Sequence, residues 1–227
     1  GEYTYGPVRE YCVQDYCESR LAKSMDEKMR ALAASMLHYG TAAQTYFKHN
    51  TEDLANANIA EQYPADTWDA ALLDEVVAYT SAPASTGDVS IVGKNLSLEG
   101  TVLVNYYFNP ATDWTVAGGK LQVWEGTTEL TEDNVAYEVD LSYGKVTASV
   151  SAWGAQSEGF VAKEYGKTTY ARAELTDTDG NVHTSDIITY SPEEYAKGRI
   201  NKSTDANMVN LAKHLVMYGE CAVQYFN

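Results

Sequence analysis

The chain is poor in basic residues and cysteine, and it lacks any long apolar run. Sixteen Lys and Arg stand against 32 Asp and Glu, which gives a formal net charge of −16. Affinity for nucleic acid comes from basic side chains that neutralise phosphates, so this composition argues strongly against nucleic acid as a partner. The same charge disfavours anionic membrane surfaces and polyanions, whereas a neutral ligand is compatible with it.

No apolar segment approaches the roughly 18–20 residues that span a bilayer, so no membrane insertion is expected. The sequence begins at Gly1 without Met or a basic-then-apolar leader, and we expect it to be a segment of a longer polypeptide. Tyrosine is abundant (18 residues), and Thr, Ser and Asn are common while Lys is scarce. This composition is typical of extracellular bacterial proteins and favours a secreted or cell-surface location.

Metal and cofactor motifs are also missing. Cys12 and Cys17 are five residues apart, about 140° around a helix, so they cannot easily pair with each other while helical. No cysteine spacing resembles a zinc or redox motif. Asp177-Thr-Asp-Gly-Asn181 resembles half of a calcium loop, but the twelfth position is Ile188 where Glu is needed, which favours a hairpin turn. We expect no metal and no cofactor.

Catalytic signatures are absent as well. The chain has no Gly-x-Ser-x-Gly, no His-Glu-x-x-His, no phosphate loop and no dinucleotide fingerprint. Two carboxylates are enough for a glycoside hydrolase, but no particular pair among 32 acidic residues can be singled out. The sequence therefore predicts a protein that is not an enzyme, with a glycoside hydrolase as a remote alternative.

The most informative feature is an internal repeat. Residues 16–47 align without a gap on residues 195–226 at a shift of 179, and 13 of the 32 positions are identical. Such a repeat predicts one local structure for both copies and a modular protein that binds or connects. Cys221 takes the place of Ala42 in the other copy, which predicts a small buried residue.

Both copies have the pattern of paired helices. In the first copy, residues 7–19 predict a helix, and Ser24-Met-Asp-Glu27 predicts the cap of a second. Apolar residues then recur at steps of three and four, which indicates one buried face. Gly40 and Gly219 interrupt these faces and predict close packing of a neighbouring element. Residues 64–79 predict a further helix and residues 81–87 a linker.

The middle of the chain has the period of β-strands. Turn signals recur every 8–15 residues, and the expected strands are 88–92, 97–108, 119–125, 134–141, 145–153, 167–176 and 181–189. The sequence therefore predicts an α+β fold, a seven- or eight-stranded antiparallel β-sandwich flanked by a helical lobe built from N- and C-terminal repeated helix pairs.

Two domain organisations fit this pattern. In the favoured one, residues 1–80 form an N-terminal helical segment, 81–190 the sandwich, and 191–227 a helical segment that packs with the first. In the other, residues 1–50 end an upstream unit and 88–227 form the module. We favour the first, because a segment of a longer polypeptide would rarely retain half of an unrelated unit.

Alternation along the strands separates core residues from candidate ligand residues. In strand 119–125, Leu121 and Val123 take the core side, which leaves Trp124 and Gln122 on the other face. In strand 145–153, the alternating Val and Ala residues are expected to face the core and Trp153 to face outward. In strand 167–176, Tyr170 and Arg172 share the outer face.

Aromatic rings on polar faces are the platforms on which neutral sugars stack, while amides and charged groups bind the hydroxyls. The candidate ligand-binding residues are Trp124, Trp153, Tyr170, Gln122, Arg172 and, at a hairpin tip, Tyr143. The alternative is that the helical lobe covers these rings and makes them core. Trp114 and Tyr107 are expected to be core residues.

The repeated text has a family resemblance. The segments 36–47 and 215–226 share Tyr-Gly-x-x-Ala-x-x-Tyr-Phe, which resembles a helix of modules in large surface and secreted proteins of anaerobic gut bacteria. Among such modules are non-catalytic starch-binding modules of starch adherence proteins in the amylosome. The resemblance implies a β-sandwich with a helix cluster that binds α-1,4-glucan between the two parts. It supplies no binding residues, so the candidates rest on strand alternation.

We therefore expect a non-catalytic carbohydrate-binding module that binds starch or a maltooligosaccharide. Its expected partners are this polysaccharide and other modules of the same polypeptide or of a cell-surface complex. The rival hypothesis is a structural or adhesive spacer whose rings only hold the layers together.

Overall fold

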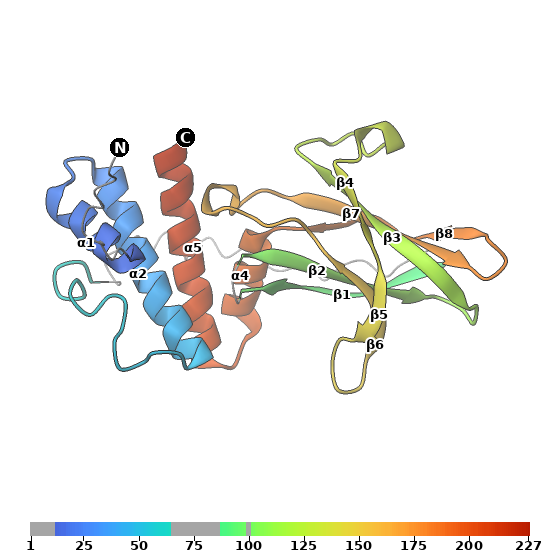
Figure 1. Ribbon diagram of the computed structural model, residues 1–227, viewed down its shortest axis with the longest axis horizontal. Helices are drawn as coiled ribbons and strands as arrows, with labels where there is room; N and C mark the ends of the chain where they lie inside the picture. Colours follow the sequence, from blue (N-terminus) through green and yellow to red (C-terminus); the bar gives the residue numbers. More distant parts are fainter. Residues whose placement is uncertain (1–11, 65–86, 99–100) are drawn as a thin grey trace, which may run out of the picture. The chain divides into compact units, whose positions relative to one another are not determined.

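The computed structural model describes residues 12–64, 87–98 and 101–227. They contain four α-helices and nine strands in two antiparallel sheets, an α+β fold (Figure 1). The chain divides into two compact units, a helical unit of residues 1–76 and 203–227 and a two-sheet unit of residues 77–202. The predicted helix at 64–79 and most of the predicted linker lie outside the described residues.

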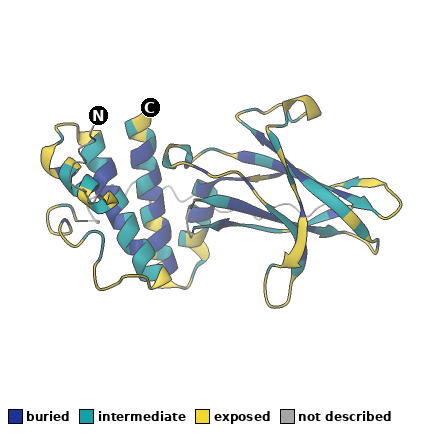
Figure 2. Cartoon of the chain, in the orientation of Figure 1, coloured by how far each residue is buried: buried dark blue, intermediate teal, exposed yellow. Residues whose placement is uncertain are grey.

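The helical unit contains α1 (Val13–Lys23), α2 (Glu27–Phe47) and α5 (Ala206–Phe226). α2 and α5 lie side by side and run in opposite directions, and each turns a stripe of buried residues inward (Figures 1 and 2). Tyr39 and Tyr218, equivalent in the repeat, stack on each other with ring centroids 5.6 Å apart. Equivalent helices of the two repeat copies therefore pack against each other.

Gly40 allows the close packing of a neighbouring segment, as predicted. A Cβ atom on Gly40 would lie 3.1 Å from the Cβ of Ala55, in the segment that follows α2. The same segment is fixed by His38, whose Nε2 lies 2.7 Å from the carbonyl oxygen of Tyr63. Cys221 is buried like Ala42, as the repeat predicts.

The two helix pairs have the same bounds once the shift of 179 residues is applied. α4 spans Pro192–Lys202 where α1 spans Val13–Lys23, and α5 corresponds to α2 in the same way. Asp26 and Asp205 cap α2 and α5 with the same two hydrogen bonds to backbone N–H groups. The predicted cap at Ser24 is wrong by two residues, since the Ser24 hydroxyl accepts from the N–H of Asp26 instead.

α4 does not belong to the helical unit, contrary to the predicted segment 191–227. Tyr195 of α4 joins the core of the sheets, and Lys94 of β1 pairs with Glu194 at 2.8 Å. The Lys94 ammonium group also donates to the carbonyl oxygen of Thr189 and lies over the ring of Tyr190. The two copies thus share local structure but pack on different partners.

The first sheet has the strand order β1-β2-β6-β5 and the second the order β4-β3-β7-β8, with β9 also paired to β7. Their bounds are β1 Val89–Ser97, β2 Leu103–Pro110, β3 Val116–Glu125, β4 Tyr137–Asp140, β5 Ser142–Lys145, β6 Ser151–Gln156, β7 Thr169–Asp177, β8 Val182–Thr184 and β9 Ile188–Tyr190. Residues of both sheets share one hydrophobic core that includes Tyr106, Phe108, Leu121, Val123 and Leu175.

Two predicted strands are each two strands in the structure. Residues 181–189 divide into β8 and β9, and residues 145–153 contain the end of β5, a turn and the start of β6. The turn of the β5–β6 hairpin is closed by the N–H of Val146, which donates to the carbonyl oxygen of Val150 at 2.9 Å. Asp177 and Gly180 form the predicted hairpin turn, with Gly180 at a φ of 87°.

Candidate functional site

The outer face of β3 and β7 has the predicted alternation, but a loop covers it. Leu121 and Val123 lie in the core, and Trp124 lies on the opposite face, where it is fully buried. Its indole N–H donates to the carbonyl oxygen of Thr131 at 2.8 Å, and the Arg172 guanidinium lies 5.4 Å from the ring centroid. Trp124 therefore offers no surface on which a sugar could stack, contrary to the prediction.

Gln122 and Arg172 are used in the same structural network. Arg172 donates to the side-chain oxygen of Gln122 at 2.6 Å and pairs with Glu132 in the loop over Trp124. The Gln122 amide donates to Glu132 at 2.8 Å and to Glu138 of β4 at 3.0 Å. The hydrogen bond from Gln122 lowers the pKa of Glu132 most, and the hydrogen bond from Arg172 lowers it further. These two predicted ligand residues hold a loop against the sheet.

Tyr170 lies beside Trp124 in the sheet and borders a surface depression. Its Cα position is paired with that of Trp124 across β3 and β7. The depression has a volume of about 490 Å³ and is lined by residues 126–129, 167–168 and Tyr170. Tyr170 is half-buried, so part of its ring remains accessible. The structure thus places Tyr170 beside Trp124 and apart from the depression that Tyr143 and Trp153 line.

Trp153 lies on the core face of its sheet, which corrects the predicted outward orientation. It is paired with Phe108 of β2, a fully buried core residue, and packs partly against the same core. Ala152 takes the opposite face. The prediction failed because it treated the turn at 146–150 as strand and assigned its Val and Ala residues to the core.

Tyr143 and Trp153 are brought together across the β5–β6 hairpin. Their ring centroids are 5.6 Å apart, and Tyr143 is 62% exposed. Trp114, from the segment between β2 and β3, lines the same depression, which has a volume of about 430 Å³. We call this site, lined by Trp114, Tyr143 and Trp153, the aromatic hollow. It contains two of the six predicted ligand residues.

Trp114 was expected to be a core residue, and it does pack partly against the core of the sheets while it also lines the aromatic hollow. In the structure Trp114 is half-buried and stacks on His183, with ring centroids 4.1 Å apart. His183 lies between two carboxylates, with Nε2 3.1 Å from Asp177 and Nδ1 3.3 Å from Asp88. The hydrogen bond to Asp177, more than that to Asp88, raises the pKa of His183.

Asn109, Thr112 and Asp113 supply polar groups at the aromatic hollow. The Asn109 amide donates to the carbonyl oxygen of Ser151 at 2.9 Å, which fixes the orientation of its side chain. Three rings with amide, hydroxyl and carboxylate groups beside them can bind a ligand with an apolar face and a hydroxylated edge.

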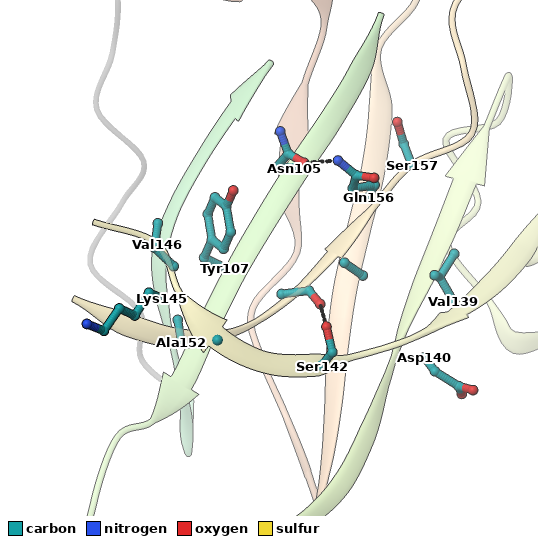
Figure 3. A pocket seen from close by; sticks show the side chains of 13 residues that line it. Asn105, Tyr107, Val139, Asp140, Ser142, Lys145, Val146, Ala152, Gln156 and Ser157 are labelled. Carbon is teal, nitrogen blue, oxygen red and sulfur yellow. Dashed lines mark hydrogen bonds between the residues drawn. The ribbon is translucent and has the colours of Figure 1, made fainter. Parts of the chain in front are cut away.

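A second depression lies on the other face of the β5–β6 hairpin (Figure 3). We call it the amide groove; it has a volume of about 590 Å³ and its lining includes Asn105, Tyr107, Ser142, Gly144, Gly154 and Gln156. The Gln156 amide donates to the side-chain oxygen of Asn105 at 2.8 Å. Tyr107 was expected to lie on a covered strand, but it is only half-buried.

In the described ranges, no three His, Cys, Asp or Glu side chains are arranged to hold a metal ion. Over the same ranges, no helix has the length and hydropathy that a membrane-spanning helix requires.

The comparisons with known proteins identify no family. No family model matches the chain, and no curated protein matches its sequence. A DUF3823 family protein from Bacteroides ovatus is similar over 46% of this chain and 55% of its own, with 14% identity and a TM-score of 0.31. The vertebrate perforin-like membrane protein Astrotactin-2 is similar over 56% of this chain and 27% of its own, with 14% identity and a TM-score of 0.28. This chain thus spans only about half and a quarter of those two structures.

Proposed function

We propose that the chain is a non-catalytic carbohydrate-binding module of a secreted or cell-surface bacterial protein, and that starch or another α-1,4-glucan is its ligand. The proposed architecture of the two-sheet unit is a β-sandwich. The observation that carries the proposal is the aromatic hollow, where three rings surround one depression.

The hollow has the chemistry that a neutral sugar requires. The C–H groups of a glucose ring form an apolar patch that can stack on Tyr143 or Trp153, and its hydroxyls can bond to groups such as Asn109 and Asp113. Tyr143 is the leading contact because most of its side chain faces solvent. A neutral ligand also avoids repulsion from a chain with a net charge of −16.

The spacer hypothesis also has a specific observation in its favour. Trp124, Gln122 and Arg172, which resembled a ligand platform in the sequence, serve only to hold the loop over the sheet. If the rings of the aromatic hollow pack in the same way against another module, the protein links modules and does not bind sugar. The glycoside hydrolase alternative has no such support among the described residues.

Affinity electrophoresis in gels that contain starch, xylan or a β-glucan tests the proposal. We expect starch to retard the intact chain and Tyr143→Ala to abolish most of the retardation. Phe226→Ala is the matched control, because it removes an exposed ring (57%) from the helical unit. Unchanged mobility in all three glycans would support the spacer, and release of reducing sugar would support a hydrolase.

A further inference from the structure

The amide groove lies on the face of its sheet that points away from the shared core. Phe108 and Trp153 are paired on the core side, so their neighbours Tyr107 and Gly154, which are also paired, lie on the other side. Gly154 is paired in turn with Ser142, and Ala152 with Gly144. The floor of the groove therefore carries almost no side-chain bulk beside Tyr107.

The ring of Tyr107 lies across this floor. A Cβ atom on Gly154 would be 2.8 Å from Cδ1 of Tyr107, so only glycine allows the ring to lie so close to β6. On the β1 side, a Cβ atom on Gly93 would meet nothing within 4 Å. Among the described residues the Tyr107 hydroxyl has no hydrogen-bond partner. The result is a flat aromatic surface with a polar end.

A row of three amides borders this ring. Asn105 donates to the side-chain oxygen of Asn95 at 2.7 Å and accepts from Gln156 at 2.8 Å. Asn105 is 8% exposed, and these two bonds leave one of its N–H groups and one of its oxygen lone pairs unused. The amides therefore hold each other in place and still offer both donors and acceptors, as hydroxyl groups require.

The charged residues that line the groove give it no net preference for an anion or a cation. Lys145 and Asp140 are the charged residues that line it, and their charges oppose each other. Ring and amides together favour a neutral, polyhydroxylated ligand, whose C–H face stacks on Tyr107 and whose hydroxyls bond to Asn105 and Gln156 (Figure 3).

We propose that the amide groove is a second carbohydrate site, so that each chain binds sugar on both faces of the β5–β6 hairpin. This inference rests on the proposed function for its ligand class. The two sites engage different stretches of a polysaccharide, and their simultaneous use raises affinity for a long chain above that for a short oligosaccharide.

Isothermal titration of the intact chain with maltotriose, and with cellotriose and xylotriose in parallel, tests the second site. We expect two binding events per chain with the matching sugar. Tyr107→Ala should remove one of them, and Gln156→Ala, a change at an exposed residue, should weaken it about fivefold. Tyr143→Ala should remove the other event, and Phe226→Ala should change neither.

The outcomes separate this inference from the proposed function. One binding event that Tyr107→Ala and Gln156→Ala leave unchanged would overturn the amide groove and leave the aromatic hollow standing. One event that Tyr107→Ala removes and Tyr143→Ala does not would support the groove and overturn the hollow. Absence of binding to every sugar by folded protein would overturn both. Urea unfolding of each variant shows that a lost event is not a lost fold.

Discussion

At the scale of single residues, the predicted ligand residues differ in what covers them. Trp124 is fully buried under a loop, Trp153 is partly buried against the core, and Tyr143 is largely exposed. All three are large aromatic residues on strands, and alternation along the strand does not distinguish them. Their difference comes from which loop or strand covers each ring in the folded chain, so each ring gives its own test.

Trp124→Phe should lower stability and leave sugar binding intact. The variant loses the hydrogen bond to the Thr131 carbonyl and part of a fully buried ring, so we expect the free energy of unfolding to fall by about 1–3 kcal/mol. Urea unfolding measures the loss, and affinity electrophoresis measures binding. Tyr143→Ala should have the opposite pattern. A folded Trp124→Phe protein that no longer binds starch would show that Trp124 contacts the ligand.

His183 makes the stability of the two-sheet unit dependent on pH. The hydrogen bonds to Asp177 and Asp88 raise its pKa above the unfolded value of about 6.5. The stabilisation is therefore complete below that pH and is lost as the pH rises through the folded pKa. Asp177 has a lowered pKa, and its contribution is lost only in acid.

Urea unfolding of the wild type and His183→Gln across neutral pH measures this dependence. We expect the stability difference between the two proteins to shrink as the pH rises. The comparison with the variant removes the opposing effect of His38, whose pKa burial lowers. A difference that is constant with pH would show that His183 is not protonated in its two carboxylate contacts.

At the scale of elements, adjacent glycines in β3 show how register determines tolerance. A Cβ atom on Gly119 would lie 2.5 Å from the carbonyl oxygen of Glu174 and 2.7 Å from Cδ2 of Leu175 in β7. A Cβ atom on Gly118 would meet nothing within 4 Å. The close approach of β7 therefore requires glycine at position 119 but not at position 118.

Gly119→Ala should destabilise the chain by about 2–3 kcal/mol, because either the β3–β7 pairing or the Leu175 side chain must move. Gly118→Ala is the matched control on the same strand and should change stability by less than about 0.5 kcal/mol. Thermal unfolding followed by circular dichroism measures both. Equal effects in the two variants would contradict the assigned register of β3 and β7.

The repeated helices show the same separation between local and distant causes. α1 and α4 have equivalent bounds, and α2 and α5 have equivalent caps, because capping and helix period depend on neighbouring residues. α1 packs on α2, whereas α4 contacts β1 through Lys94 and Glu194. The choice of partner is not a property of the repeat.

At the scale of the whole molecule, the helical unit is built from both ends of the chain. α2 comes from the N-terminal part and α5 from the C-terminus, and each buries its apolar stripe against the other. Both sheets and α4 lie in one continuous stretch that contains every candidate binding residue. The helical unit therefore needs two segments that are far apart in the sequence in order to fold, whereas the two-sheet unit is formed by one continuous segment.

Removal of residues 203–227 should unfold the helical unit and leave the two-sheet unit folded. α2 would lose the partner that covers its apolar stripe, and a short helix pair without such packing is marginal in water. Far-UV circular dichroism and urea unfolding measure the outcome. Removal of Phe226 and Asn227 alone is the control, and loss of the sheets in the longer truncation would contradict the division into two units.

The sequence by itself determined the features that arise from nearby residues. These are the equivalence of the two repeated helix pairs, the turn at Asp177-Gly180 and the alternation along β3 and β7, all of which follow from backbone periodicity and local hydrogen bonds. Only the tertiary structure decided which faces are covered. The loop with Thr131 and Glu132 buries Trp124, and the hairpin turn at 146–150 reverses the face assigned to Trp153. Burial depends on segments that meet through folding, and the spacing of residues along a strand carries no information about them.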